Sequence, residues 1–367
     1  MCVSVRRCSE RAKRISLPDM GGDILIYGAN GYTGRLVVER ALARGLKPVL
    51  AGRNRQAVEA LAAETGLPSR VFDLNGDVSG ELSSIGTVLH LAGPFSRTSA
   101  PMLAACLAAC AHYIDITGEI DVFEALAARD TAAKAAGITV LSGAGFDVVP
   151  SDCLAAHLKR RLPGAVSLDL VIGGLNEASR GTTRTMLEGM AAGTRVREGG
   201  VIVELSEVPR GTADFGGGLK PTVGVSWGDV STAWHSTGIP DIRVFFETSP
   251  PLERALGMPR LLRALIASAP GRWLAGRAID RMPPGPDAEA RGRGRSVLVG
   301  HAADAEGNRA VSQLETPEGY TLTALTAVEI ARRVHGGEVA PGFHTPSSAF
   351  GPDFILGFSG VKRRDLS

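Results

Sequence analysis

Apolar and polar segments alternate through the first 150 residues in the pattern of a parallel sheet with crossover helices. Short runs rich in Ile, Leu and Val predict strands at 23–27, 48–52, 70–74, 87–92, 112–116 and 138–142. Runs rich in Ala, Leu, Glu and Arg predict helices between them, such as 34–44 and 55–64, each followed closely by a glycine. Continuous apolar strands are typical of a sheet that helices cover on both faces. Residues 23–164 are therefore predicted to form a doubly wound α/β domain of the Rossmann type.

The pattern changes after residue 164, where apolar and polar residues alternate along longer runs separated by glycine-rich turns. The alternating runs lie at 166–172, 242–246, 295–301 and 310–315, and the last two flank a turn at 306–308. Such hairpins predict a second α+β domain at 165–316, built on a largely antiparallel sheet, which would bind substrate or mediate dimerisation. A final helix is expected at 322–334, within a segment (317–367) that returns to the first domain.

The segment before the first strand does not fit either domain. Residues 1–22 are basic but lack the apolar run of a secretion signal. We expect a disordered tail or a start-site extension, since Met20 offers a second start.

Composition narrows the class of protein. The 367 residues are 44% hydrophobic and 21% charged, as in globular proteins, and the net charge of +2 implies no basic surface for nucleic acid. Five cysteines without disulfide or zinc spacing favour a reducing compartment, so we expect a cytoplasmic protein. The seven histidines are scattered without ligand spacing, so no metal is expected. No apolar run of about 18 residues predicts a membrane span.

A glycine pattern follows the first predicted strand and opens the first helix, which is the setting of a dinucleotide site. Gly28 would permit a tight turn, Gly31 a close approach of the pyrophosphate, and Gly34 the packing of helix on strand. The phosphates would lie at the helix N-terminus beside Asn30, Tyr32 and Thr33. The alternative is an ordinary strand–turn–helix.

The end of the second strand bears on the choice of cofactor. It carries Arg53 and Asn54, and no carboxylate that would hold the ribose hydroxyl of NAD. Arg53 is placed to bind a 2'-phosphate, with Arg55 as a second cation, so NADP (NADPH) is favoured. The alternative is that these arginines only solvate a loop. Near the same edge, Asp73 is expected to reach the adenine, and Ala92, Gly93 and Pro94 to pass close to the cofactor.

Several other enzyme mechanisms are excluded by missing motifs. None of the four tyrosines has a lysine four positions on, so the proton donor of the short-chain dehydrogenases is absent. The sequence also lacks HExxH, GxSxG and the P-loop pattern, so metalloprotease, hydrolase and P-loop functions have no support.

Five segments together resemble the saccharopine dehydrogenase-like oxidoreductases, the group that includes trans-acting enoyl reductases. They lie at 28–34, 50–53, 92–95, 112–119 and 145–152, and the similarity resumes weakly at 342–350. The resemblance implies a Rossmann domain that binds NADP, a second domain that supplies a sheet, and hydride transfer. It does not fix a substrate, which would be a small molecule or a lipid-like compound.

Hydride transfer calls for a proton donor near the carboxyl edge of the sheet. Asp147 and Asp115 rank first, because carboxylates among glycine or apolar neighbours have less local structural purpose. Tyr113 is an alternative that also fits the core. Glu119, Ser151 and Asp152 are others, although acids and serine at these positions also suit helix starts.

Two further segments suggest contacts beyond the cofactor. Residues 180–184 start a helical run that would bind an anionic substrate group or would simply be a capped helix. Residues 261–266 and 273–275, interleaved with arginines, suit either a helix lying on anionic lipid or an amphipathic surface helix. We therefore expect an NADP-dependent oxidoreductase, acting by enoyl or carbonyl reduction, with peripheral membrane contact and a homodimer left open. The alternative is an NADP-binding sensor or scaffold without turnover.

Overall fold

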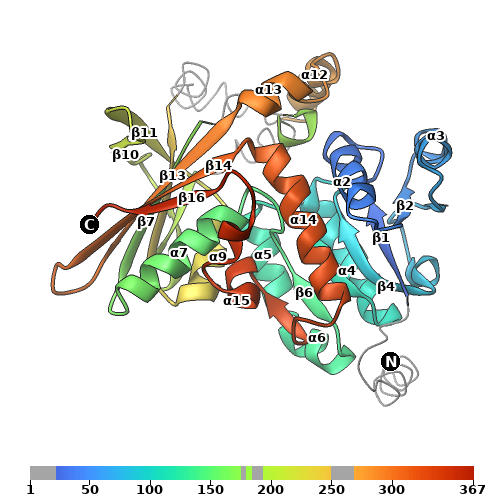
Figure 1. Cartoon of the computed structure of the whole chain (residues 1–367), viewed down its shortest axis with the longest axis horizontal. Coiled ribbons are helices and arrows are strands. Elements are labelled where there is room, and N and C mark those ends of the chain that lie inside the picture. Colours follow the sequence, from blue (N-terminus) through green and yellow to red (C-terminus); the bar gives the residue numbers. More distant parts are fainter. Residues whose placement is uncertain (1–21, 175–178, 184–192, 249–267) are drawn as a thin grey trace. The chain divides into compact units, whose positions relative to one another are not determined.

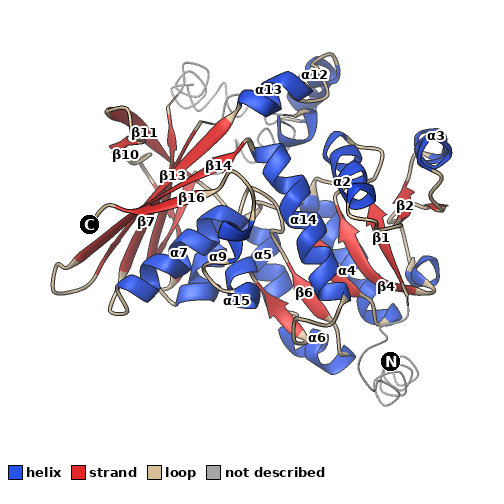
Figure 2. Cartoon of the chain, viewed as in Figure 1, coloured by secondary structure: helices blue, strands red, loops and turns tan. Residues whose placement is uncertain are grey.

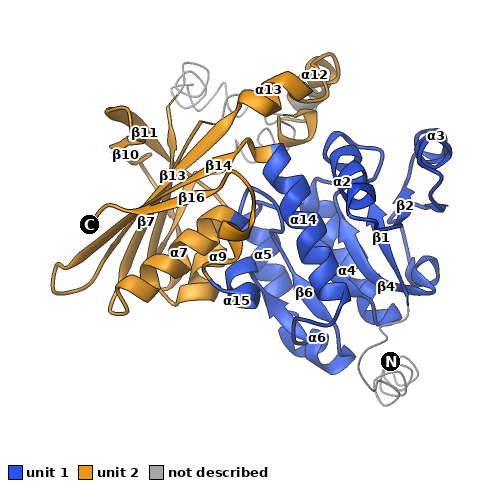
Figure 3. Ribbon diagram, in the orientation of Figure 1, with its two compact units in different colours: residues 1–149, 320–351 blue, residues 150–319, 352–367 orange. Residues whose placement is uncertain are grey.

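The chain folds into two compact units, each with its own sheet (Figures 1 and 2). This computed structural model describes residues 22–174, 179–183, 193–248 and 268–367. Unit 1 contains residues up to 149 and residues 320–351, whereas unit 2 contains residues 150–319 and 352–367 (Figure 3).

Unit 1 is a doubly wound parallel sheet, as the apolar runs predict. Its seven strands lie in the order β15-β6-β5-β4-β1-β2-β3. Their bounds are β1 Asp23–Tyr27, β2 Val49–Gly52, β3 Ser69–Val71, β4 Ile85–His90, β5 His112–Asp115, β6 Thr139–Leu141 and β15 Gly342–His344. The third strand is shorter than expected because Asp73 begins a turn, in which its Oδ1 accepts a hydrogen bond from the Asn75 amide (2.9 Å).

Helices cover both faces of this sheet. They are α2 Tyr32–Ala43, α3 Arg55–Thr65, η1 Ser79–Leu82, α4 Phe95–Ala109, α5 Ile120–Ala127, α6 Asp130–Ala136, α14 Gly319–His335 and α15 Pro346–Phe350. Ala41 of α2 and Val328 of α14 meet Ile26 on one face. Met102 of α4 belongs to the core cluster on the other face, with Leu25. The segment after β5 forms two helices, because the chain turns between α5 and α6.

Unit 2 has a nine-stranded sheet that is largely antiparallel, as predicted. The central strands β7 and β12 pair in parallel, and the other described pairings are antiparallel. The strands are β7 Ser167–Gly173, β8 Thr194–Glu198, β9 Val201–Leu205, β10 Arg210–Asp214, β11 Leu219–Val225, β12 Asp241–Glu247, β13 Arg295–Ala303, β14 Arg309–Pro317 and β16 Lys362–Asp365. The described helices are α7 Val149–Arg161, α9 Asp229–Thr237, α12 Ala269–Asp280, α13 Ala288–Arg293 and η2 Phe354–Gly357.

The domain limits differ from those expected at both ends of unit 2. Helix α7 packs on the second sheet, where a Cβ at Gly300 would lie 2.5 Å from Leu158, so the change of unit falls near residue 149 rather than 164. The C-terminal part of the chain is divided between the two units. Residues 320–351 join unit 1, but β16 pairs with β14 in unit 2.

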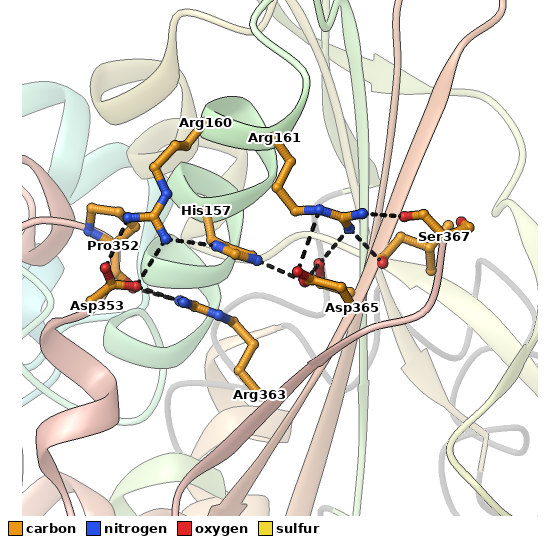
Figure 4. Close-up of polar contacts among 10 residues, drawn as sticks. His157, Arg160, Arg161, Pro352, Asp353, Arg363, Asp365 and Ser367 are labelled. Carbon is orange, nitrogen blue, oxygen red and sulfur yellow. Dashed lines mark hydrogen bonds and ion pairs between the residues drawn. The ribbon is translucent and has the colours of Figure 1, made fainter.

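Polar side chains of α7 hold this last segment in unit 2 (Figure 4). His157 Nε2 donates to Asp365 Oδ1 (2.8 Å), and Arg160 binds both carboxylate oxygens of Asp353 (2.8 and 3.0 Å). Arg161 donates to the carbonyl oxygen of Val311 on β14 (2.8 Å). Three side chains of one helix, within five positions, therefore fix segments that follow it by about two hundred positions in the sequence.

Candidate active site

The turn between β1 and α2 is shaped by close approaches that only glycine allows. Gly28 has φ +86°, and a Cβ there would lie 3.0 Å from Ala92. A Cβ at Gly34 would lie 2.2 Å from the Gly28 carbonyl oxygen, well inside van der Waals contact. The Gly28 amide donates to the Ala51 carbonyl (2.8 Å), which ties the turn to β2. The helix start is therefore pressed against the end of β1.

The N-terminus of α2 suits an anion. Its N-cap is Gly31, which has no side chain to occupy the first amides, and its first turn contains no acidic residue. Gly31 is exposed, and a Cβ there would meet only the Gly28 oxygen, at 3.3 Å. Free helix amides and the helix dipole both favour a phosphate at such a place. The residues present therefore fit the diphosphate of a dinucleotide, with Tyr32 and Thr33 in the same turn.

The side chain of Asn30 has a structural role at the end of β2. Its Oδ1 lies where a Cβ on Gly52 would be only 2.9 Å away. The absence of a side chain at Gly52 thus lets Asn30 cover the end of β2, which brings the first and second strand ends together.

Three consecutive residues at the end of β2 have different surroundings in the structure. Asn54 accepts a hydrogen bond from the Ala57 amide (3.1 Å) and so caps α3. Arg55 pairs with Glu59 (2.9 Å) on the exposed surface of α3. Arg53 is exposed, and in the described part of the chain no carboxylate lies within ion-pair distance of it. Arg53 is therefore the cation that remains available at this edge.

Arg53 and Asp73 both lie near the hydroxyl of Tyr27. That hydroxyl donates to the Phe72 carbonyl (3.1 Å). Burial raises the pKa of Tyr27 to about 12, while the charge of Arg53 opposes this change and the charge of Asp73 adds to it. The structure thus brings Arg53 and Asp73 to the same corner of the sheet, as expected for an adenosine pocket.

The segment after β4 lines the other side of the glycine turn. Thr98 Oγ1 donates to the Ala92 carbonyl (2.7 Å) and accepts a hydrogen bond from His90 Nε2 (2.9 Å). Burial lowers the pKa of His90 to about 3, so this histidine is neutral and acts as a fixed donor. Gly93 and Pro94 follow and lead directly into α4.

Glu119 has a role that the sequence does not reveal. Its carboxylate accepts from the amides of Phe95 (2.8 Å) and Ser96 (2.9 Å), so it caps the first turn of α4. The acid at the start of α5 therefore serves a different helix, 24 residues earlier in the chain.

Asp115 is a buried hydrogen-bond centre. Its carboxylate accepts from the Tyr113 hydroxyl (2.8 Å), the Ser142 hydroxyl (2.8 Å), the Gly143 amide (3.0 Å) and the Thr117 amide (3.2 Å). Burial raises the pKa of Asp115, while these hydrogen bonds act in the opposite direction. Two of these donors, Ser142 and Gly143, tie the end of β5 to the segment after β6, which is a structural task.

Asp147 has the properties of a proton donor. It is partly buried in the loop after β6, and burial raises the pKa of its carboxyl to about 7. Its Oδ2 lies against Gly118, where a Cβ would be 3.0 Å away. Near neutral pH such a group is present in both protonation states, which is the condition for efficient general acid–base catalysis.

Helix α14 supports the loop that carries Asp147. Thr323 Oγ1 accepts from the Phe146 amide (2.9 Å), and Thr326 Oγ1 donates to the Ala144 carbonyl (2.8 Å). One turn earlier, Tyr320 packs edge-to-face on Tyr32, with ring centroids 5.1 Å apart. The helix thus joins the glycine turn to the acid-bearing loop. No local sequence signal could reveal this, because the contacts span more than 170 residues.

The remaining candidates lie elsewhere or are not described. Ser151 and Asp152 are buried in the first turn of α7, in unit 2. The Ser179 hydroxyl accepts from the Thr182 amide (3.2 Å), as in a capped helix, and Arg184 and residues 261–266 lie outside the described residues. Pro270 stands in the first turn of α12, which begins at Ala269.

The described residues contain neither a metal-binding cluster nor a membrane-spanning helix. No group of three or more His, Cys, Asp or Glu side chains there could hold a metal ion. No helix in the same residues is long and apolar enough to cross a membrane.

Comparison with known proteins confirms the resemblance over the nucleotide domain. Residues 24–141 match the family model described as the saccharopine dehydrogenase NADP binding domain. A trans-acting enoyl reductase of Mycobacterium ulcerans is 32% identical over 155 residues, which cover 38% of this chain and 36% of that protein. A second one, from Mycobacterium leprae, is 31% identical over 150 residues, with the same shares. The match spans little more than a third of these relatives.

A solved structure extends the likeness to the fold of both units. Saccharopine dehydrogenase (L-Glu forming) from Saccharomyces cerevisiae, in its apo form, aligns with a TM-score of 0.64 at 13% identity. The alignment covers 95% of this chain and 100% of that one. A Rossmann-type domain followed by a second sheet domain is therefore the shared architecture.

The packing of Gly34 gives a first testable prediction. Gly34→Ala should lower the free energy of unfolding by about 1–3 kcal/mol, because its Cβ would overlap the Gly28 oxygen. Gly276→Ala is the matched control, since Gly276 also lies in a helix but has open space around it. That change should raise stability by about 0.5–1 kcal/mol. Chemical denaturation measures both, and equal effects would contradict the close approach.

Asp147 gives a prediction of pH dependence. Folding raises its pKa to about 7, so the protonated acid is favoured in the folded state. This contribution to stability is complete below the unfolded pKa of about 4 and is lost as the pH rises through about 7. The free energy of unfolding of the wild type should therefore fall relative to Asp147→Asn between about pH 5 and pH 8. Parallel pH profiles for the two proteins would show that Asp147 is not perturbed.

Proposed function

We propose that this chain is an NADPH-dependent oxidoreductase that reduces an enoyl or carbonyl group, with Asp147 as the proton donor. The observation that carries this proposal is the combination, within unit 1, of a dinucleotide turn with a carboxyl group whose pKa is raised to about 7. The family model over residues 24–141 and the names of the relatives support the same class of reaction.

The preference for NADP rests on Arg53. A guanidinium group binds a phosphate through two parallel hydrogen bonds, and Arg53 is exposed at the strand end where the adenosine ribose lies in this fold. Asn54 and Arg55 are occupied by Ala57 and Glu59, so they do not compete for the same anion. The end of β2 carries no carboxylate, which is the group that would bind the free ribose hydroxyl of NAD.

The chemistry divides between cofactor and protein. When bound, the nicotinamide supplies a hydride to the electron-poor carbon of the substrate. The electron pair displaced from the double bond then takes up a proton. The Asp147 carboxyl, whose pKa is raised to about 7, supplies this proton at neutral pH. Thr323 holds the Phe146 amide and so fixes the direction of the loop. The products are the saturated or hydroxyl compound and the oxidised cofactor.

The proposed substrate class follows from the named relatives. Trans-acting enoyl reductase is the name of the mycobacterial proteins that match the nucleotide domain. An α,β-unsaturated thioester is therefore the first substrate to test, and a ketone of similar size is the second.

Cofactor preference is tested at Arg53. The wild type should bind NADPH more tightly than NADH in a fluorescence titration, and Arg53→Ala should remove most of this difference, about tenfold or more. Arg55→Ala is the matched control, because Arg55 is already paired with Glu59. Equal affinities in the wild type, or an equal loss in both variants, would exclude the assigned role of Arg53.

Turnover is tested at Asp147. NADPH oxidation with a panel of enoyl thioesters and ketones should be seen for the wild type, and Asp147→Asn should lower kcat by about 10²–10⁴-fold while leaving the Kd for NADPH nearly unchanged. Thr323→Val should lower kcat less, because it displaces the acid without removing it. Tight NADPH binding with no turnover on the whole panel would instead favour a cofactor-binding sensor or scaffold.

A further inference from the structure

Unit 2 contains a polar cavity of about 480 Å³ at the edge of its sheet. Its lining residues come from the last two strands: Gln313 and Glu315 of β14, and Lys362, Arg363 and Arg364 of β16. No part of the nucleotide domain contributes to this lining.

The pairing of the two strands explains why cations gather there. Gln313 lies opposite Arg364, and Glu315 lies opposite Lys362. Because alternate residues of a strand point to opposite faces, Lys362 and Arg364 share one face of the sheet with Gln313 and Glu315. Two adjacent cations thus lie over one amide and one carboxylate, and the face carries a net positive charge.

The other face of β16 is an anchor (Figure 4). Arg363 donates to the Pro352 carbonyl (3.0 Å) and to Asp353 Oδ1 (2.5 Å). Asp365 accepts from His157 (2.8 Å) and from the Ser312 hydroxyl (2.7 Å). Arg160 Nη2 donates to His157 Nδ1 (3.0 Å), so the histidine is neutral and its other nitrogen must donate to Asp365. The strand is therefore held firmly from the α7 side.

The two cations on the cavity face are not neutralised in the same way. Arg364 donates to the neutral amide oxygen of Gln313, so it is oriented but keeps its charge. Gln313 itself is 4% exposed, which makes it a fixed support. Lys362 is exposed and forms no ion pair among the described residues. A positioned guanidinium beside an exposed, unpaired ammonium is suited to a phosphate group.

We propose that this cavity is a second binding site, for a phosphate group carried by an organic molecule. Lys362 and Arg364 bind the phosphate, and Gln313 holds Arg364 in place. A cavity of about 480 Å³ lies in the range of small-molecule sites and is much larger than a phosphate ion needs, so the group belongs to a larger ligand. This site does not depend on the function proposed for unit 1.

Isothermal titration of the full chain with inorganic phosphate, and separately with coenzyme A as a phosphate-bearing organic molecule, tests the proposal. The protein is first saturated with NADPH, so that the dinucleotide turn is occupied. The wild type should bind both probes, with coenzyme A the tighter. The double variant Lys362→Gln/Arg364→Gln should weaken both by at least about fivefold. Binding of inorganic phosphate alone would overturn the assignment of a larger ligand.

Control variants separate this site from the rest of the chain. Arg309→Gln removes the same charge from an exposed position on β14 and should leave both affinities unchanged. Loss of coenzyme A binding when the wild type is saturated with NADPH would place the phosphate in unit 1 and overturn the proposal. Lys362→Gln alone removes no described hydrogen bond, and it provides a variant that folds if the double variant does not. Unaltered affinity in Lys362→Gln and in the double variant would contradict the site.

Discussion

The contact on which the nucleotide domain depends is the approach of α2 to the end of β1. A Cβ at Gly34 would lie 2.2 Å from the Gly28 oxygen, so a side chain of any size would push the helix away from the sheet. That displacement would move the amides of the first helical turn away from the strand end, where a diphosphate binds. The same contact also sets the position of Tyr32, on which Tyr320 of α14 packs. One missing side chain thus affects both the cofactor site and its link to the acid-bearing loop.

Two carboxylates at neighbouring strand ends, the buried Asp115 and the partly buried Asp147, have different surroundings and are assigned different roles. Asp115 receives four hydrogen bonds, and those from Ser142 and Gly143 hold the ends of β5 and β6 together. For Asp147, burial is the cause that dominates, and its pKa rises to about 7. A carboxyl group that is shielded from water retains its proton to a higher pH than one in water. Burial is the largest cause of the raised pKa at both carboxyls, and at Asp115 the hydrogen bonds from four donors oppose it.

The sequence predicts the first domain well because its signals are local. Strand β1 and the glycine turn lie where the apolar run and the spacing of Gly28, Gly31 and Gly34 put them, and α3 ends at Gly66 in the left-handed conformation. The features that the sequence missed all depend on distant partners. Glu119 caps a helix that precedes it, Thr323 supports a loop far upstream, and β16 leaves the first domain to pair with β14. Periodicity and capping patterns carry no information about such partners. The pairing of Arg55 with Glu59 is predictable from the sequence, because residues four apart face each other on a helix.

The central claim is that the amides at the start of α2 bind the diphosphate of a reduced dinucleotide. Titration of the ¹⁵N-labelled protein with NADPH, followed by transverse relaxation-optimised NMR, tests it residue by residue. The account predicts that the largest amide shifts fall on Gly31, Tyr32, Thr33 and Gly34, and that they saturate together. Saturable binding that leaves these four amides unchanged, or no binding at all, would contradict it.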